Sequence, residues 1–216
     1  MFAVLVPLKR PDRAKTRLAR SGVADHQHLA VAFARDTIAA ADASPLVEGV
    51  WVVTDAADLV PPHAHHLPDE GAGDLNEALA RAAAILGSSR PGLGIAALCA
   101  DLPALSSADL TEALSSSDQR SFVADAAGTG TTLLVAGAGV DLMPAFGEGS
   151  AQRHTDSGAV ALTSPLSTLR LDVDTAEDLE RARSVGVGPN TLAALAESVT
   201  TKTMGDPPAG EPPIVV

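Results

Sequence analysis

The sequence predicts an α/β fold with a mainly parallel sheet flanked by helices, and three observations support this. Apolar runs without alternation, such as the one that begins at Gly94, are typical of strands covered on both faces. Segments of helical periodicity separate these runs, as in a chain of strand–helix units. The 216 residues are enough for one domain with a sizeable core, and no linker or repeat divides residues 1–199.

The first predicted strand, Phe2 to Val6, ends at Pro7 and is followed by a basic segment. Residues 9–18 hold five of the chain's 15 basic residues: Lys9, Arg10, Arg13, Lys15 and Arg17. A position just past a first strand is where α/β proteins bind phosphates, although an ordinary solvated loop is the alternative. Neither a P-loop nor a dinucleotide fingerprint is present, so side chains would have to supply most of the phosphate contacts.

The next part of the chain predicts a helix over residues 25–43 and a buried strand over 49–55. Residues 61–68 contain His63, His65 and His66 between prolines, which favours a surface loop over a metal site.

The segment from Asp69 to Asn76 then leads into a helix that runs to about Leu86. Its glycines allow the backbone to approach a ligand closely. Asn76 fits a helix cap better than a contact to a nucleotide base, and both interpretations remain open.

The run that begins at Gly94 stops at Asp101, because Pro103 has no N–H for a strand ladder. Ser106 or Ser107 then caps a helix. The carboxylate of Asp101 would therefore stand at the carboxyl end of a central strand, where α/β sheets bind ligands. A plain turn residue is the alternative.

Further along, residues 121–125 predict a short strand, and residues 128–136 predict a glycine-rich turn that leads into another strand. Two glycine-rich loops, at 128–132 and 146–150, have amides and hydroxyls that could hold an anion, and Ser150 would cap a helix. The simpler interpretation of each loop is an ordinary turn.

Near the end of the chain, residues 169–175 predict a strand whose alternation places Asp172 and Asp174 on one face. Thr175 would cap a helix over residues 176–185, and a last helix would run from Pro189 to Val199. The proline-rich residues 200–216 predict a disordered tail.

Charge and composition exclude several classes of function. The net charge of -12 argues against non-specific binding to nucleic acid or to an anionic membrane. The single cysteine, Cys99, rules out an internal disulfide framework, and its apolar setting favours a packed thiol over a nucleophile. Because no signal peptide or membrane-spanning segment is recognisable, the chain is expected to be cytoplasmic.

Together these features predict chemistry on phosphates. Carboxylates at strand ends can hold a hard divalent cation, and a basic loop can neutralise a nucleoside triphosphate. No Ser/His/Asp or Cys/His set supports a nucleophile. The pattern therefore favours phosphoryl or nucleotidyl transfer by positioning and charge neutralisation.

Five motifs in order resemble the 2-phospho-L-lactate guanylyltransferase family of coenzyme F-420 biosynthesis, which includes the phosphoenolpyruvate guanylyltransferases. They are Val6-Pro-Leu-Lys9 with Ala14-Lys-Thr-Arg-Leu18, Ala100-Asp-Leu-Pro-Ala-Leu105, Gly128-Thr-Gly-Thr-Thr132, Phe146-Gly-x-Gly-Ser150 with His154, and Asp172-Val-Asp-Thr-x-Glu-Asp-Leu179. The resemblance covers residues 2–185. It implies a single-domain, Rossmann-like fold of the GT-A-like nucleotidyltransferase superfamily.

The resemblance also implies a reaction: the phosphate of phosphoenolpyruvate or 2-phospho-L-lactate attacks the α-phosphorus of GTP, and pyrophosphate leaves. It implies catalytic roles near the phosphates for Lys9, Lys15, Arg17 and Asp101, and nucleotide contacts at Pro7, Leu8, Gly73 and Asn76. Thr132, Gly147 and Ser150 would bind the acceptor. Mg²⁺ would be held by Asp101 with Asp172 or Asp174. The chain has Asp74 where family members often have glycine, which adds a negative charge near the expected nucleotide pocket, and this side chain could face solvent or contact the base.

Two other functions remain open. One is a related nucleotidyltransferase that uses another nucleotide and a sugar or molybdenum-cofactor phosphate. The other is a non-catalytic nucleotide-binding homologue, against which the three retained carboxylates argue. The sequence decides neither between the two acceptors, although it favours phosphoenolpyruvate, nor whether the chain forms a homodimer.

Overall fold

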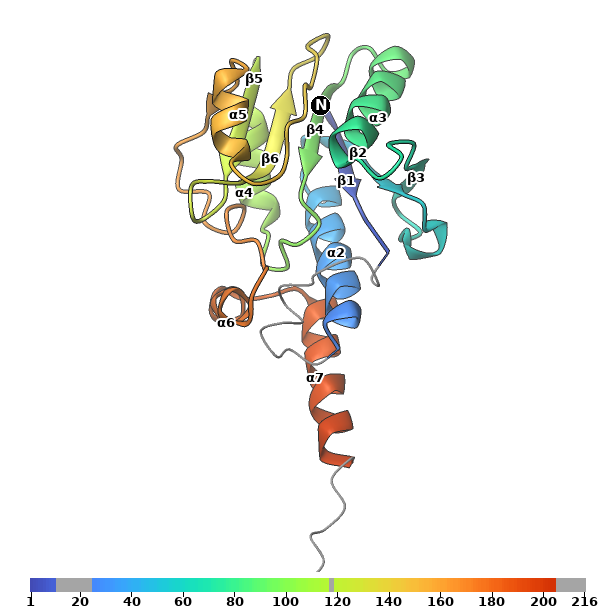
Figure 1. Ribbon diagram of the computed structural model, residues 1–216, viewed down its shortest axis with the longest axis vertical. Helices are drawn as coiled ribbons and strands as arrows, with labels where there is room; N and C mark the ends of the chain where they lie inside the picture. Colours follow the sequence, from blue (N-terminus) through green and yellow to red (C-terminus); the bar gives the residue numbers. More distant parts are fainter. Residues whose placement is uncertain (11–24, 117–118, 205–216) are drawn as a thin grey trace, which may run out of the picture.

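The computed structural model describes residues 1–10, 25–116 and 119–204, and it has three layers with a sheet between two sets of helices (Figure 1). The strands of the sheet are β1 (Phe2–Pro7), β2 (Val47–Thr54), β3 (His65–Pro68), β4 (Gly94–Leu98), β5 (Arg120–Ala124), β6 (Thr131–Ala136) and β7 (Val160–Ala161). The helices are α2 (His26–Asp42), η2 (Ala57–Leu59), α3 (Leu75–Ser89), α4 (Ser107–Ser115), α5 (Ser150–Asp156), α6 (Ala176–Val185) and α7 (Pro189–Met204).

The strand order is β3-β2-β1-β4-β6-β5-β7, and β6 runs antiparallel to both of its neighbours while the other pairs are parallel. The predicted α/β class with a mainly parallel sheet is therefore confirmed. The chain builds outward from β1 to β2 and β3 on one side, and continues through β4 on the other. Such a reversal of direction opens a crevice beyond the carboxyl end of the central strands.

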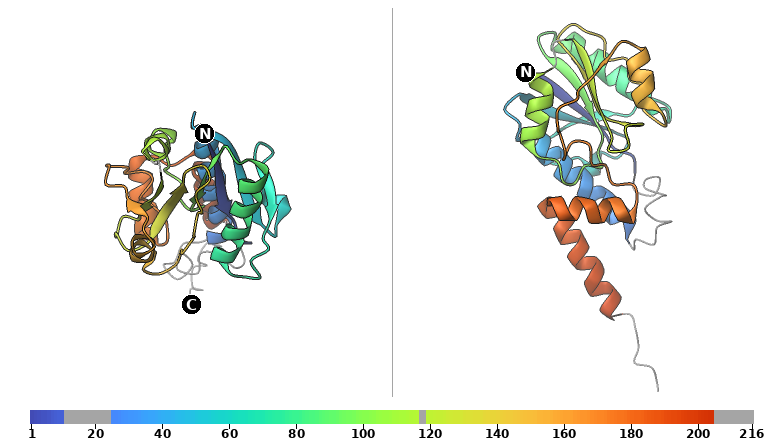
Figure 2. Two further views of the ribbon diagram at one scale, coloured as in Figure 1. Left: turned by 90° about the horizontal axis from the view of Figure 1, so that it is seen from above. Right: turned by 90° about the vertical axis from the view of Figure 1, so that its left-hand side faces the viewer.

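Each face of the sheet packs against its own helices, as the two further views show (Figure 2). Apolar residues of α2 and α4 cover one face. Those of α3 and α5 cover the other face. A third cluster joins the start of α2 to α6 and α7, beside the carboxyl edge of the sheet. Strand β1 has apolar neighbours on both faces, which explains why its sequence shows no alternation.

Helix starts follow the predicted cap chemistry in part. Ser106 caps α4 by accepting from the Asp109 amide, and Thr175 caps α6 in a capping box with Asp178. At α3 the cap is Asp74, which accepts from the amides of Asn76 and Glu77. Asn76 is therefore not the cap. At α5 the cap position is Gly149 in a left-handed conformation, so the expectation that Ser150 caps this helix is wrong.

Two predictions of regular structure were wrong. Residues 65–68 form the edge strand β3, because prolines are tolerated at a sheet edge and the His65 ring stacks on Trp51 at 4.7 Å. Residues 169–175 do not join the sheet. Leu171 and Val173 are buried in the third cluster, so the alternation reflects packing under the sheet edge rather than a strand ladder.

The last helix continues past the predicted end at Val199 to Met204, and residues 205–216 lie outside the described part. The division into a domain over 1–199 and a tail stays a prediction. Within the residues that the structure describes, no helix is long and apolar enough to cross a membrane. A cytoplasmic location also stays a prediction.

Candidate active site

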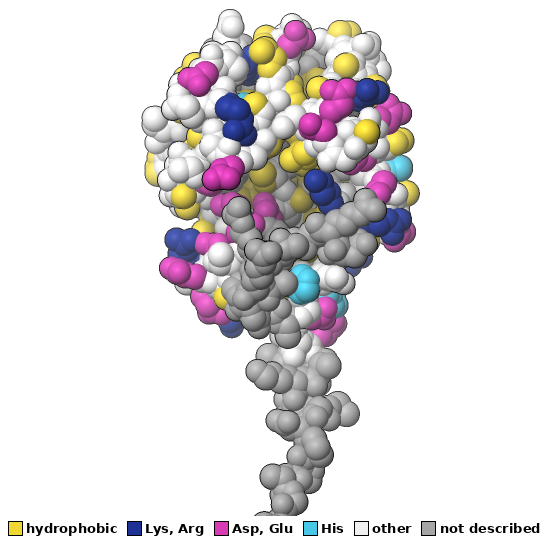
Figure 3. All heavy atoms as spheres, in the orientation of Figure 1, with side chains coloured by type: hydrophobic (Ala, Val, Ile, Leu, Met, Phe, Trp, Pro, Cys, Tyr) yellow, Lys and Arg dark blue, Asp and Glu magenta, His cyan; other side chains and the backbone are white. Residues whose placement is uncertain are grey.

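A cleft of about 560 Å³ opens at the carboxyl edge of the sheet, where the topology places a ligand crevice. Its walls come from the ends of β1 and β4, the turn between β5 and β6, the loop before α5 and the segment before α6. Ala30 and Val31 of α2 add an apolar patch. On the face shown in Figure 3, hydrophobic side chains lie in a central hollow with acidic side chains along its edge.

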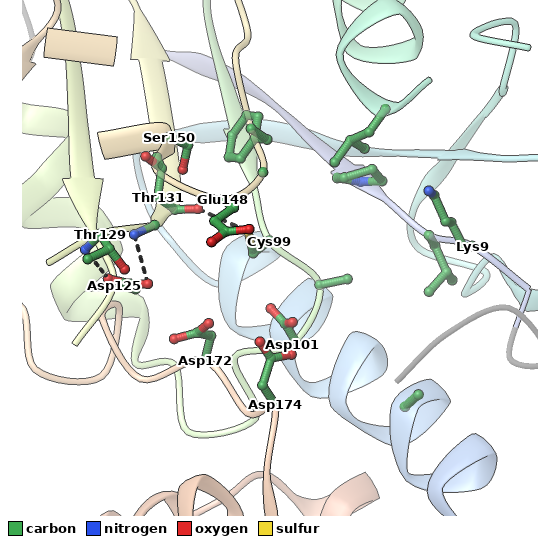
Figure 4. A pocket seen from close by; sticks show the side chains of 18 of the residues that line it. Lys9, Cys99, Asp101, Asp125, Thr129, Thr131, Glu148, Ser150, Asp172 and Asp174 are labelled. Carbon is green, nitrogen blue, oxygen red and sulfur yellow. Dashed lines mark hydrogen bonds between the residues drawn. The ribbon is translucent and has the colours of Figure 1, made fainter. Parts of the chain in front are cut away.

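Asp101, Asp172 and Asp174 lie together in the wall of this cleft, and the charges of the other two act on Asp172 (Figure 4). All three are partly buried. The backbone N–H of Val173, which lies between the other two aspartates, donates to the Asp101 carbonyl at 3.0 Å. This hydrogen bond fixes the two acid-bearing segments side by side, so the predicted trio forms without a strand at residues 169–175.

Thr37 of α2 holds the backbone on both sides of Asp101. Its buried hydroxyl accepts from the Leu102 amide at 3.1 Å and lies 3.3 Å from the Ala100 carbonyl and 2.9 Å from the Phe33 carbonyl. A threonine inside a helix gave no sequence signal for this role. The hydroxyl ties the segment that carries Asp101 to the rigid body of α2.

The replacement Thr37→Val is expected to lower the free energy of unfolding by about 1–3 kcal/mol, because it leaves the buried Leu102 amide without its acceptor. Thr37→Ser keeps the hydroxyl, so its free energy of unfolding should fall less than that of Thr37→Val. Urea unfolding of the three proteins measures the difference. Equal stability of the valine and serine variants would show that the hydroxyl does not hold this segment.

The electrostatics of the cluster favour a cation. Burial first, and then the charges of Asp101 and Asp174, raise the pKa of Asp172 to about 7. Among the described residues, no group of three or more His, Cys, Asp or Glu side chains is arranged to hold a metal ion by itself. Magnesium commonly takes one or two protein carboxylates and completes its shell with water and substrate phosphates. The converging carboxylates therefore fit a metal that is shared with a phosphate substrate.

Lys9 lies on the opposite wall of the cleft from Asp125 and Thr129, at the end of β1 (Figure 4). Pro7 and Leu8 also line the cleft, and the Leu8 amide donates to the Val53 carbonyl at 2.9 Å. The predicted catalytic residues Lys15 and Arg17 lie outside the described residues. Lys9 is thus the basic side chain that the described structure brings to this pocket.

The turn between β5 and β6 forms another wall. Asp125 accepts from the amides of Thr129 and Gly130, both at 2.9 Å (Figure 4). A Cβ on Gly130 would lie 2.4 Å from the Asp125 carboxylate, so a larger residue here would have to displace this side chain from its present position. Thr129, Gly130 and Thr131 line the cleft, whereas the predicted Thr132 is buried outside its lining.

The loop before α5 supplies Phe146, Gly147, Glu148, Gly149 and Ser150 to the cleft. Of the predicted acceptor residues, Gly147 and Ser150 are therefore in the pocket. The prediction of an open helix start for an anion is wrong in part. The Ser150 amide donates to the Gly147 carbonyl and the Ala151 amide donates to the Thr129 carbonyl, each within 3.1 Å.

His154 holds this loop from the protein interior. It is fully buried between the rings of Phe122 and Phe146. Its Nε2 accepts from the Ala145 amide at 3.0 Å, so Nδ1 carries the proton and donates to the Thr131 hydroxyl at 2.9 Å. Burial first, and then the charges of Arg153 and Arg120, lower the pKa of His154 to about 4. The ring is therefore neutral near pH 7.

Acid is expected to remove the stabilisation that His154 provides. The unfolded chain protonates this ring below about pH 6.5, whereas the folded protein resists protonation until about pH 4. The free energy of unfolding of the wild type should exceed that of His154→Gln by a constant amount above pH 6.5. This difference should shrink by about 3 kcal/mol as the pH falls to 4. Urea unfolding of both proteins across this range measures it, and a pH-independent difference would contradict it.

The two predicted residues at the start of α3 lie elsewhere. Gly73, with φ of 95°, is exposed, and neither it nor Asn76 lines the cleft. Leu75 between them does line it. The Asn76 side chain instead bonds the backbone of Phe146. Asp74, which adds a charge near the expected nucleotide, is exposed and engaged as a helix cap.

Several cleft residues were not singled out from the sequence as ligand contacts. Glu148 and Asp125 add two carboxylates, and Cys99 lies against the wall with its thiol 3.3 Å from the Thr131 carbonyl. Asp125 follows β5 as Asp101 follows β4, so the same pattern, a carboxylate after a buried strand, could have predicted it. Cys99 faces the cleft, although it also packs against the core as predicted.

The α/β fold and this cleft, with carboxylates facing a lysine at the switch point of the sheet, define a nucleotidyltransferase. Solved structures agree on the fold. A nucleotidyl transferase from Methanothermobacter superposes with a TM-score of 0.58 at 21% identity, covering 85% of this chain and 96% of that one. A Desulfovibrio desulfuricans G20 structure described as a nucleotide-diphospho-sugar transferase gives 0.63 at 17% identity, covering 94% and 98%.

The family profile "Guanylyl transferase CofC like" matches residues 2–191. A phosphoenolpyruvate guanylyltransferase of Streptomyces avermitilis is 47% identical, covering 95% of this chain and 99% of its own length. Another from Geodermatophilus obscurus is 50% identical, covering 90% and 94%. The chain belongs to the CofC-like guanylyl transferase family, which confirms the resemblance found in its motifs.

Proposed function

We propose that the protein transfers GMP from GTP to the phosphate of phosphoenolpyruvate, with release of pyrophosphate, as a step in coenzyme F-420 biosynthesis. The observation that carries this proposal is the acidic trio Asp101, Asp172 and Asp174 facing Lys9 across one cleft. The family and the names of relatives at 47–50% identity support guanylyl transfer and this acceptor.

The reaction needs positioning more than proton transfer. An oxygen of the acceptor phosphate attacks the α-phosphorus of GTP, the bond from that phosphorus to the β-phosphate oxygen breaks, and pyrophosphate leaves with the electron pair. The acceptor oxygen is already an anion, so no general base is required. The new bond is a phosphoanhydride between guanosine monophosphate and the enolpyruvyl phosphate.

Each part of the cleft has a task in this proposal. Asp101, with Asp172 or Asp174, would hold Mg²⁺, which would supply charge neutralisation between the two substrates. Lys9 contributes positive charge on the nucleotide side, where Pro7 and Leu8 line the wall. Lys15 and Arg17 would add to this charge. Gly147 and Ser150, which line the cleft, would orient the acceptor's carboxylate end.

Pyrophosphate release tests the proposal directly. Purified protein with Mg²⁺ is given GTP and either phosphoenolpyruvate or 2-phospho-L-lactate in separate reactions. We expect release with phosphoenolpyruvate, and loss of release when CTP, UTP or ATP replaces GTP. Release with 2-phospho-L-lactate alone would change the acceptor, and release with CTP or UTP would favour a different nucleotidyltransferase of this fold.

A further inference from the structure

The backbone of the loop before α5 is held by side chains at consecutive polar groups. The Ala145 amide donates to His154, and Arg153 donates to the Ala145 carbonyl from Nε at 3.1 Å and from Nη2 at 2.9 Å. The next residue, Phe146, donates from its amide to Asn76 Oδ1 at 2.6 Å and accepts at its carbonyl from Asn76 Nδ2 at 3.1 Å. All four main-chain polar groups of these two residues are therefore fixed.

The side chain that holds Phe146 comes from a more distant part of the chain than those that hold Ala145. Arg153 and His154 belong to α5, which directly follows the loop. Asn76 lies 70 residues away in the sequence, in the first turn of α3. A carboxamide presents a donor and an acceptor side by side, so one side chain can pair with the N–H and the C=O of a single residue. The pair joins the segment at residues 69–76 to the loop at 146–150.

This connection controls groups that line the cleft. Phe146, Gly147 and Glu148 are all in its wall, and Leu75, the neighbour of Asn76, is in the wall as well. Gly147 has φ of 118°, a conformation in which other residues are strained. Fixing both polar groups of Phe146 sets the direction in which the Gly147 peptide leaves it. Asn76 itself does not line the cleft, and its amide is directed at the Phe146 backbone.

We propose that Asn76 is a positioning residue for the acceptor substrate, acting through the Phe146 backbone on Gly147, and not a contact to the guanine. The identity of the acceptor in this inference rests on the proposed function. When the pair is present, the loop is ordered before the acceptor arrives. Without it, acceptor binding must also order the loop, so the acceptor KM rises while GTP binding is unchanged.

Steady-state kinetics of two variants test this role. Asn76→Ala removes both hydrogen bonds, and Asn76→Asp keeps an acceptor for the Phe146 amide while placing carboxylate oxygen against the Phe146 carbonyl. A carboxylate in the first turn of α3 is favourable for the helix, so this second variant is expected to fold. We expect the acceptor KM to rise about tenfold or more in Asn76→Ala, with the GTP KM within about twofold of wild type.

Ser44→Ala is the matched control. It removes one partly buried side-chain hydrogen bond, between the hydroxyls of Ser44 and Thr111 at 2.7 Å, at the opposite end of α2 from the cleft. We expect both of its KM values to equal those of the wild type. The proposal would be overturned if the Asn76 variants kept the acceptor KM of the wild type but had a higher GTP KM or a weaker preference for GTP over ATP. Such a result would indicate that Asn76 contacts the guanine.

Amide hydrogen exchange gives a readout that does not depend on turnover. We expect residues 145–148 to exchange faster in Asn76→Ala than in the wild type or Ser44→Ala, with the Kd for GTP unchanged. If the wild type uses neither acceptor, the proposed function fails, whereas these two measurements still decide the role of Asn76. The proposed role of Asn76 would be overturned if Asn76→Ala left the exchange rates of residues 145–148 unchanged and bound GTP more weakly than the wild type.

Discussion

Replacement of Asp101 by asparagine is expected to lower kcat by about a thousandfold, the scale of losing one preorganised electrostatic partner of a transition state. Asp101 stands at the end of β4, and Val173 and Thr37 hold its backbone on two sides. Asparagine keeps the size of the side chain and removes the negative charge that would hold Mg²⁺. Initial rates of pyrophosphate release at saturating GTP and acceptor measure the effect.

Asp156→Asn is the matched control, because this exposed carboxylate belongs to α5 and accepts from the Gln152 side chain at 2.8 Å. Its rate should equal that of the wild type. Binding of Mn²⁺, followed by electron paramagnetic resonance, should weaken in Asp101→Asn and stay unchanged in Asp156→Asn. Full activity of Asp101→Asn would remove this carboxylate from the proposed mechanism.

Asp172→Asn is expected to stabilise the metal-free protein while abolishing turnover. Burial, Asp101 and Asp174 raise the pKa of Asp172 from 3.8 to about 7, so the folded protein holds this proton more tightly than the unfolded chain. Asp172 therefore costs the folded protein no stability below pH 4. The cost grows as the pH rises, and it reaches its full size above pH 7. Because the group is only partly buried, we expect a gain of about 2 kcal/mol in the free energy of unfolding at pH 8.

Urea unfolding in the presence of EDTA at pH 8 and at pH 4 measures this effect. The variant should be more stable than the wild type at pH 8 and equal to it at pH 4. This direction is opposite to that of His154, whose contribution is lost in acid, so the two groups can be separated. A variant that is destabilised at pH 8 would contradict the electrostatic description of the cluster.

Much of the fold could be predicted because its signals are local. The uninterrupted apolar runs of β1 and β4 indicated strands covered on both faces, and Ser106 and Thr175 marked the helix starts. The segment at 169–175 misled because side-chain alternation is a property of any extended chain. Whether such a chain joins a ladder depends on neighbours distant in sequence. At β3, the prolines suggested a loop, yet a sheet edge accepts them.

The candidate site could be predicted where a residue type and its strand-end position carry the information. Asp101, Lys9, Gly147 and Ser150 do lie in the cleft together with Asp172 and Asp174. Asn76 could not be placed in this way, because its partner is 70 residues away and an asparagine near a helix start has several common roles. Thr37 gave no signal for the same reason: its function depends on a backbone segment that only the folded chain brings near.

A ³¹P NMR spectrum of one reaction tests the central proposal most directly. Protein, Mg²⁺, GTP and phosphoenolpyruvate are mixed, and the products are followed with time. We expect GTP to be replaced by equal amounts of pyrophosphate and a new phosphoanhydride, whose two coupled phosphorus signals belong to guanosine monophosphate and enolpyruvyl phosphate. Unchanged GTP, or conversion of GTP to GDP and inorganic phosphate with phosphoenolpyruvate intact, would contradict guanylyl transfer to this acceptor.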